Sequence, residues 1–139
     1  TGAPPSGTNN IYVVHQAKAV GTINPADGTI TADKMAENTG GFLDWQAVVT
    51  GNTTMVAGRG YFVNTSGGAI TMTLPASATR GDTIAIIDYG ATADTNNITV
   101  GRNSHNIQGS GANLTVSTER AAFELIYVDS TQGWLLNQK

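Results

Sequence analysis

RGYFVNTSGGAITMTLP, from Arg59 to Pro75, places two short runs of strand-forming residues on either side of the polar turn Thr65-Ser66-Gly67-Gly68. Apolar and hydroxyl side chains alternate in Ile70-Thr71-Met72-Thr73-Leu74, which predicts a strand with one buried face. Pro75 closes this strand, because proline cannot donate a hydrogen bond to a sheet. We therefore expect residues 59–75 to form a β-hairpin whose apolar face builds a core.

Short apolar runs separated by turn residues continue from Trp45 to the end of the chain, which is typical of an all-β sandwich or barrel. The runs Ile84–Ile87 and Phe123–Val128 do not alternate, so we expect them to be central strands covered on both faces by a second sheet or another chain. The predicted strands are Trp45–Val49, Thr53–Ala57, Tyr61–Asn64, Ala69–Leu74, Asp82–Asp88, Asn97–Val100, Asn113–Val116, Ala121–Asp129 and Gly133–Leu136.

The first third of the chain has a different character. Residues 1–10 are rich in proline, glycine and serine and predict a flexible linker or a cut site, so we expect the chain to be the C-terminal part of a longer protein. Residues 11–44 predict an extended arm without a core of its own, in which only Thr31–Asn38 resembles a helix. Residues 45–139 then form the predicted β-rich head.

Composition excludes several classes of function. Charged residues make up 12% of the chain, and the net charge of -3 comes from 10 acidic and 7 basic residues scattered singly. The chain therefore has no basic stripe for a nucleic acid, and its apolar runs are far shorter than the roughly twenty residues of a membrane helix. Because no cysteine occurs, disulfides, thiolate metal sites and a cysteine nucleophile are excluded. We predict no cofactor.

Few residues predict catalysis or metal binding. His15 and His105 lack the spacing of a metal site, and Gly109-Ser110-Gly111 lacks the strand and helix that flank a nucleophilic serine. We expect Asp82, Asp88, Asp94 and Asp129 to bond backbone amides in turns. The alternative is a calcium loop at Ala91–Asn97, although its single carboxylate is a poor basis for affinity.

The run from Met55 to the C-terminus contains an ordered set of motifs. An aromatic strand, YFVN (61–64), is followed by TMTLPA (71–76), GDTIAI (81–86), NNITV (96–100) and the turn IQG (107–109), and a closing aliphatic strand precedes Gly133-Trp134. In this order the run resembles a module at the ends of tail-fibre and other virion proteins of tailed bacteriophages. Residues 28–35 also resemble fibre-shaft segments.

The resemblance implies a jelly-roll-like β-sandwich head in a homotrimer, located in the virion. It implies a non-enzymatic role, the tip of a tail fibre that attaches to a glycan or protein on the host surface. Long, polar, glycine-containing loops are the expected contact segments, here 89–97 and 102–112. The candidate contact residues are Tyr89, Asp94, Asn96, Asn97, Arg102, Asn103, His105 and Asn106, with Tyr12, Tyr89 and His105 as candidates for stacking on a sugar ring.

Two other functions stay open. The chain could be a purely structural trimerisation or virion-decoration module with no specific receptor. It could also be a depolymerase that cleaves polysaccharide between paired carboxylates, for which the sequence offers Glu37, Glu119 and Glu124 beside the turn aspartates.

Overall fold

The structure, a computed structural model, describes residues 42–137. The predicted linker, the arm as far as residue 41 and the candidate helix Thr31–Asn38 lie outside these residues. Within 42–137 the chain is all-β and contains no helix. It accordingly has no helical segment there that could cross a membrane.

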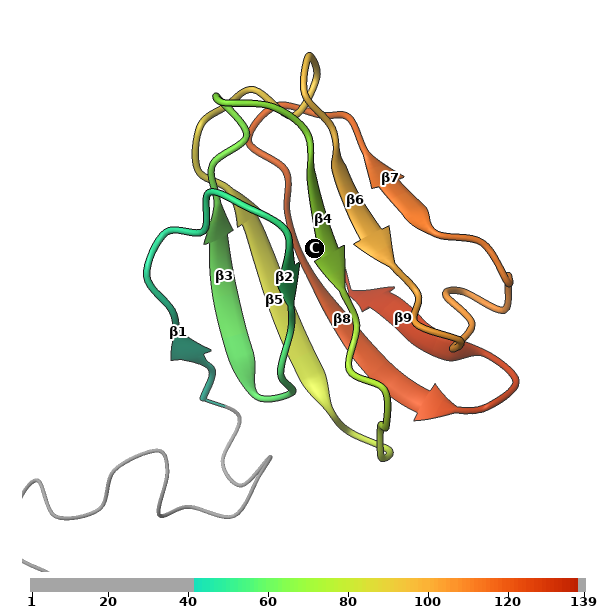
Figure 1. Cartoon of the computed structure of the whole chain (residues 1–139). Coiled ribbons are helices and arrows are strands. Elements are labelled where there is room, and N and C mark those ends of the chain that lie inside the picture. The colour runs from blue at the N-terminus through green and yellow to red at the C-terminus, as the bar shows by residue number, and fades with distance from the viewer. Residues whose placement is uncertain (1–41, 138–139) are drawn as a thin grey trace, which may run out of the picture. The chain divides into compact units, whose positions relative to one another are not determined.

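Two mixed sheets make up the described structure (Figure 1). One sheet has five strands in the order β1-β3-β5-β8-β9, and the other has four in the order β2-β4-β6-β7. The strands are β1 Asp44–Trp45, β2 Thr53–Thr54, β3 Arg59–Val63, β4 Ile70–Thr73, β5 Thr83–Asp88, β6 Ile98–Gly101, β7 Leu114–Val116, β8 Ala122–Asp129 and β9 Gly133–Asn137.

The chain alternates between the two sheets from β1 to β6. As a result β1, β3 and β5 are parallel neighbours in one sheet, and β2, β4 and β6 are parallel neighbours in the other. Parallel neighbours require a crossover connection, and here the intervening strand in the opposite sheet provides it. The last three strands, β7 to β9, each pair antiparallel with a neighbour.

The predicted hairpin of residues 59–75 is wrong. The turn exists, since the Gly68 N–H donates to the Thr65 carbonyl, but β3 and β4 belong to different sheets. β3 pairs with β5, and β4 pairs with β6. The alternating pattern identifies the buried face of each strand, and that face is the same whether two strands lie side by side or face each other across a core. The parallel pairs also depart from a jelly roll, whose strands are antiparallel.

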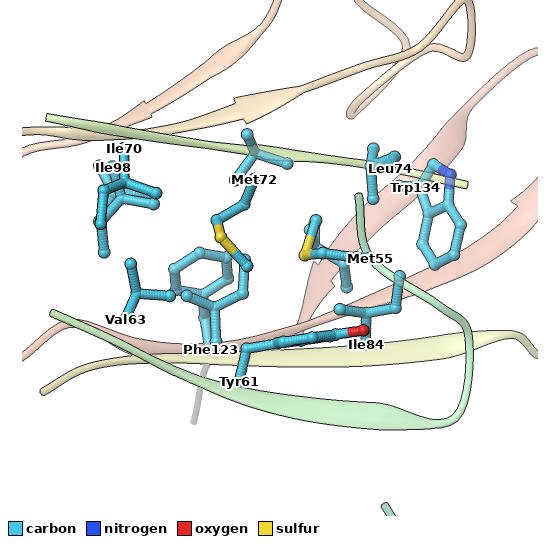
Figure 2. Packing of buried hydrophobic residues seen from close by; sticks show 14 of the residues in the cluster. Met55, Tyr61, Val63, Ile70, Met72, Leu74, Ile84, Ile98, Phe123 and Trp134 are labelled. Atoms are coloured by element: carbon cyan, nitrogen blue, oxygen red, sulfur yellow. The ribbon is translucent and has the colours of Figure 1, made fainter. Parts of the chain in front are cut away.

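Buried side chains from both sheets form one core (Figure 2). The alternation predicted for β4 is confirmed, because Ile70, Met72 and Leu74 are buried whereas Thr71 and Thr73 are only half-buried. From the five-stranded sheet Tyr61, Val63, Ile84, Phe123 and Trp134 point toward them. Full burial of each large apolar side chain contributes about 1.5–3 kcal/mol, so this layer is the main source of stability.

All nine predicted strands occur, but the first two are shorter than expected. After β1 only an isolated bridge between Val49 and Val63 continues the predicted strand Trp45–Val49. β2 ends at Thr54 because the chain then turns towards β3: the Val56 N–H donates to the Tyr61 hydroxyl (2.8 Å), and Gly58 has a positive φ of 82°.

The expectation that Ile84–Ile87 and Phe123–Val128 are covered on both faces is met only in part. β5 lies at the centre of its sheet, and Ile84, Ala85 and Ile86 are buried, but Ile87 is half-buried. β8 is buried at Phe123 and Leu125 and half-buried from residue 126 onward. Within the described residues the outer side of the five-stranded sheet is therefore incompletely covered.

Candidate functional site

The two predicted contact loops lie at opposite ends of the described structure. Loop 89–97 leads into β6 and loop 102–113 leaves it, so this one strand separates them (Figure 1). We call the two groups of loops the Tyr89 end, residues 64–69, 89–97 and 117–121, and the Arg102 end, residues 55–58, 75–82, 102–113 and 130–132. The eight candidate residues therefore do not form one site.

The Tyr89 end is organised around Asp88, the last residue of β5. This carboxylate is fully buried, and its Oδ2 accepts hydrogen bonds from the backbone N–H groups of Ala93 (3.4 Å) and Arg120 (3.1 Å). Within residues 42–137 its Oδ1 has no hydrogen-bond partner. One side chain thus fastens loop 89–97 and loop 117–121 to the end of the same strand.

A second set of contacts joins loop 64–69 to loop 89–97. The buried hydroxyl of Thr65 lies 2.9 Å from the hydroxyl of Thr92, and the Asn96 amide donates to the Thr65 carbonyl at 2.9 Å. Gly90 permits the close approach, because a Cβ there would lie 2.7 Å from Oδ1 of Asn64. The three loops therefore brace one another, which holds the surface groups of this end in place.

Tyr89 is the exposed aromatic residue of the Tyr89 end. It is 51% exposed, and the Arg120 guanidinium donates to its carbonyl at 2.8 Å. A half-exposed aromatic ring beside hydrogen-bonding groups can stack on a sugar ring or on an apolar side chain of a partner. Arg120, which the sequence analysis did not select, adopts a positive φ of 57° there.

The other candidates on loop 89–97 differ in their availability. Asp94 is exposed, and its only described hydrogen bond is a long one, 3.4 Å from the Thr95 hydroxyl. The amide of Asn96 is occupied as described, and the amide of Asn97 donates to the Ala93 carbonyl at 2.9 Å. Both asparagines thus shape the loop, and their side-chain amides already have partners within the protein.

At the Arg102 end the side chains of the predicted contact residues make contacts within the protein. The Arg102 guanidinium donates to the His105 carbonyl (3.1 Å), the Asn103 amide to the Leu74 carbonyl (2.8 Å) and the Asn106 amide to the Thr131 carbonyl (2.9 Å). The His105 ring packs edge-on against Tyr127, with ring centroids 5.5 Å apart. Tyr12, the remaining candidate for sugar stacking, lies outside the described residues.

A groove of about 400 Å³ opens at the Arg102 end, between residues 54–57 and 75–79. Its lining consists of small, apolar and hydroxyl-bearing side chains, Met55 included, together with the carboxylate residue Asp82. Val56, which also lines the groove, is 45% exposed. None of the eight candidates lines the groove. Sequence reasoning missed the groove because it selected long glycine-containing loops, whereas the short segments 54–57 and 75–79 line most of the groove.

The predicted turn role is confirmed for three of the four aspartates. Asp82 accepts from the Thr79 N–H and hydroxyl, Asp88 binds two amides, and Asp129 accepts from the N–H groups of residues 131 and 132. Asp94 is the exception, since its described hydrogen bond comes from a hydroxyl.

Residues 42–137 contain no group of three or more His, Asp or Glu side chains that could hold a metal ion. In the proposed calcium loop the N–H groups of Thr95 and Asn96 donate to the Thr92 carbonyl, which closes a turn. Glu119 lies in a loop of the Tyr89 end, whereas Glu124 lies within β8 and accepts a hydrogen bond from Asn137 (3.0 Å). Glu37 and His15 lie outside the described residues.

No family model and no curated protein matches this sequence.

Proposed function

We propose that this chain is a non-enzymatic domain of a bacteriophage virion appendage, the β-sandwich head of a homotrimeric tail-fibre tip that attaches to a glycan or protein on the host surface. The motif order of residues 55–139 supports the class of protein. The exposed ring of Tyr89, on loops that hydrogen bonds hold to one another, is the observation that supports attachment. The aromatic ring and the hydroxyl and amide groups of the neighbouring loops suit a hydroxyl-rich ligand.

Three copies in one particle would strengthen binding through a site that is weak on its own. A single aromatic ring with a few hydrogen bonds gives low affinity, but three such sites held in one particle raise the effective concentration for the second and third contacts. Attachment then depends on the density of the ligand on the host surface.

The test is binding of the fluorescently labelled protein to a panel of bacterial cells and to an array of bacterial surface polysaccharides. Tyr89→Ala should reduce binding at least tenfold to any surface that the wild type recognises, because the ring is the main exposed contact. Thr115→Ala, on an exposed position of β7, is the matched control and should leave binding unchanged. Equal binding by wild type and Tyr89→Ala would refute the assignment of this end.

A purely structural module is the second candidate, and one observation favours it. Seven of the eight candidate side chains are hydrogen-bonded or packed within the protein, at Asp94, Asn96, Asn97, Arg102, Asn103, His105 and Asn106. A well-folded wild type that binds no cell or polysaccharide would favour this role. Release of reducing ends from a polysaccharide would instead indicate a depolymerase.

A further inference from the structure

The outer faces of the two sheets differ in chemistry. On the four-stranded sheet the outward positions of adjacent strands form a row of threonines, Thr71, Thr99 and Thr115, and a second row contains Thr54, Thr73 and Gly101. Polar side chains at outward positions are typical of a sheet face that is exposed to water. This face needs no further cover.

The five-stranded sheet presents mainly apolar residues at the corresponding outward positions, with the polar side chains of Thr83, Glu124 and Asn137 among them. One row across the strands is Phe62, Ile87 and Ala122, and a neighbouring row is Trp45, Gly60, Ala85, Glu124 and Asn137. Ile126 and Leu135 form a third pair. We call these outward residues of β1, β3, β5, β8 and β9 the apolar face. Trp45 is 45% exposed and Leu135 is 37% exposed, and exposed apolar side chains that gather on one face mark a contact surface.

The apolar face has both a ridge and a hollow. The Trp45 ring lies directly over Gly60, where a Cβ would come within 2.5 Å of it, and it stacks on Phe62 with centroids 4.8 Å apart. Beside this aromatic ridge is a hollow of about 300 Å³, whose lining includes the small residues Ala85 and Ala122. A single protomer thus carries an exposed aromatic ring and, next to it, a recess that is mainly apolar but also lined by Glu124 and Asn137.

We propose that the apolar face is the contact surface for a second copy of this chain. The inference rests on the homo-oligomer in the proposed function and names the surface that forms it; it does not depend on attachment to a host. Ridge and hollow on one face allow copies to interlock, because each copy supplies both shapes. Among the outward residues of the rows named above, the one charged side chain is Glu124, which accepts a hydrogen bond from Asn137 and so keeps a partner when the face is buried.

The size of the face indicates how far the contact extends. Five strands about 4.8 Å apart and about five residues long cover roughly 400 Å² of flat area. A stable interface buries about 800 Å² per partner. The contact must therefore continue past the sheet edge, and the residues that flank β1 provide apolar surface there: Phe42 is 87% exposed and Val48 is 41% exposed.

The chain's course agrees with this assignment. β1 and β9, the first and last strands described, are the two edges of this same sheet. Phe42, the first residue described, is two residues before β1, so its exposed side chain lies near the edge of this sheet.

The test is the solution mass of the full chain by light scattering coupled to size exclusion. We expect about three times the protomer mass of 14.4 kDa for the wild type. Ala122→Arg, an exposed position in the hollow, should reduce it to the single-protomer mass, and Leu135→Lys should weaken assembly in the same direction. Thr115→Arg, on the threonine face, is the matched control and should keep the wild-type mass.

A second measurement uses the two tryptophans and needs no variant. Trp134 is fully buried in the protomer, so quenching of fluorescence by iodide reports mainly on Trp45. We expect Trp45 to be protected in the assembled wild type and to become at least threefold more quenchable on dilution to monomer. If Ala122→Arg does not fold, the quenching of Trp45 still shows whether the apolar face is buried between copies.

Two outcomes would overturn the inference. One is an assembly whose mass is unchanged by both Ala122→Arg and Leu135→Lys and whose Trp45 stays quenchable; the interface would then lie elsewhere. The other is a monomeric wild type, which would also remove the proposed trimer. An assembled wild type that binds no host cell refutes attachment and leaves the interface standing.

Discussion

Substitution of Gly133 by alanine should be among the most destabilising single changes at a turn in this protein. Gly133 has a positive φ of 71°, and a Cβ added there would lie 1.8 Å from the backbone oxygen of Asn106. The same oxygen accepts a hydrogen bond from the Trp134 N–H at 2.9 Å. The glycine therefore lets loop 102–113 lie directly against the start of β9.

The expected cost has three parts. A left-handed conformation costs a non-glycine residue about 1–2 kcal/mol. Contact distances between a Cβ and its neighbours are ordinarily at least 3.4 Å, so the Asn106 backbone must move well over 1 Å. That movement breaks its hydrogen bond to Trp134, and loss of a hydrogen bond costs about 1 kcal/mol, or more if the buried N–H stays unpaired. The two parts with a magnitude sum to at least about 2 kcal/mol, and the displacement of the Asn106 backbone adds to this, so the Tm should fall by roughly 8 °C or more.

The assay is thermal and urea unfolding at one fixed protein concentration, since the proposed assembly would make the apparent stability concentration-dependent. Gly58→Ala is the matched control: its φ is 82°, but nothing lies within 4 Å of the added Cβ, so it should show the backbone cost alone. Gly67→Ala, with neither a positive φ nor a near neighbour, should have little effect. Equal losses at Gly133 and Gly58 would show that the contact with Asn106 carries no energy.

Two further changes probe the core and the Tyr89 end. Met72→Ala removes a fully buried side chain and should cost about 2–5 kcal/mol in urea unfolding; a loss below 1 kcal/mol would mean that the two sheets do not pack as described. Asp88→Ala removes the acceptor for the Ala93 and Arg120 amides, so hydrogen exchange at those two amides should accelerate at least tenfold while β4 keeps its protection. Unchanged exchange would show that Asp88 does not hold the loops. Asp88→Ala should lower the free energy of unfolding by less than Met72→Ala does, because it also removes Oδ1, which is buried without a hydrogen-bond partner among the described residues.

The positions of the strands could be predicted because their signals are local. Alternation in Ile70–Leu74, the stop at Pro75 and the glycines at turns each act over a few residues, and the structure has a strand in every predicted place. The partners of those strands could not be predicted in the same way. β3 and β4 bury the same side chains in a hairpin as in two facing sheets, so their sequences do not distinguish the two arrangements.

The candidate site, too, could be predicted only in part from the sequence. Loop length and polarity correctly located exposed Tyr89 and Asp94, which lie at a surface turn. The same criteria also selected Asn96 and Asn103, whose amides bind backbone carbonyls that are about thirty residues away in the sequence. Polarity alone does not show whether an amide binds solvent, a partner or its own fold. Arg120 was missed because its role depends on its position beside Asp88 and Tyr89.

By itself, then, the sequence determined the class of fold, the strand positions, the buried face of β4 and the scarcity of charge, since each follows from residue type and short-range periodicity. The tertiary structure decided which strands pair, that the two predicted contact loops lie at opposite ends, and that one sheet has a threonine face while the other has an apolar face. The physical reason is that hydrogen-bond partners and shared faces join residues far apart in the chain. Their alignment exists only after the backbone has folded.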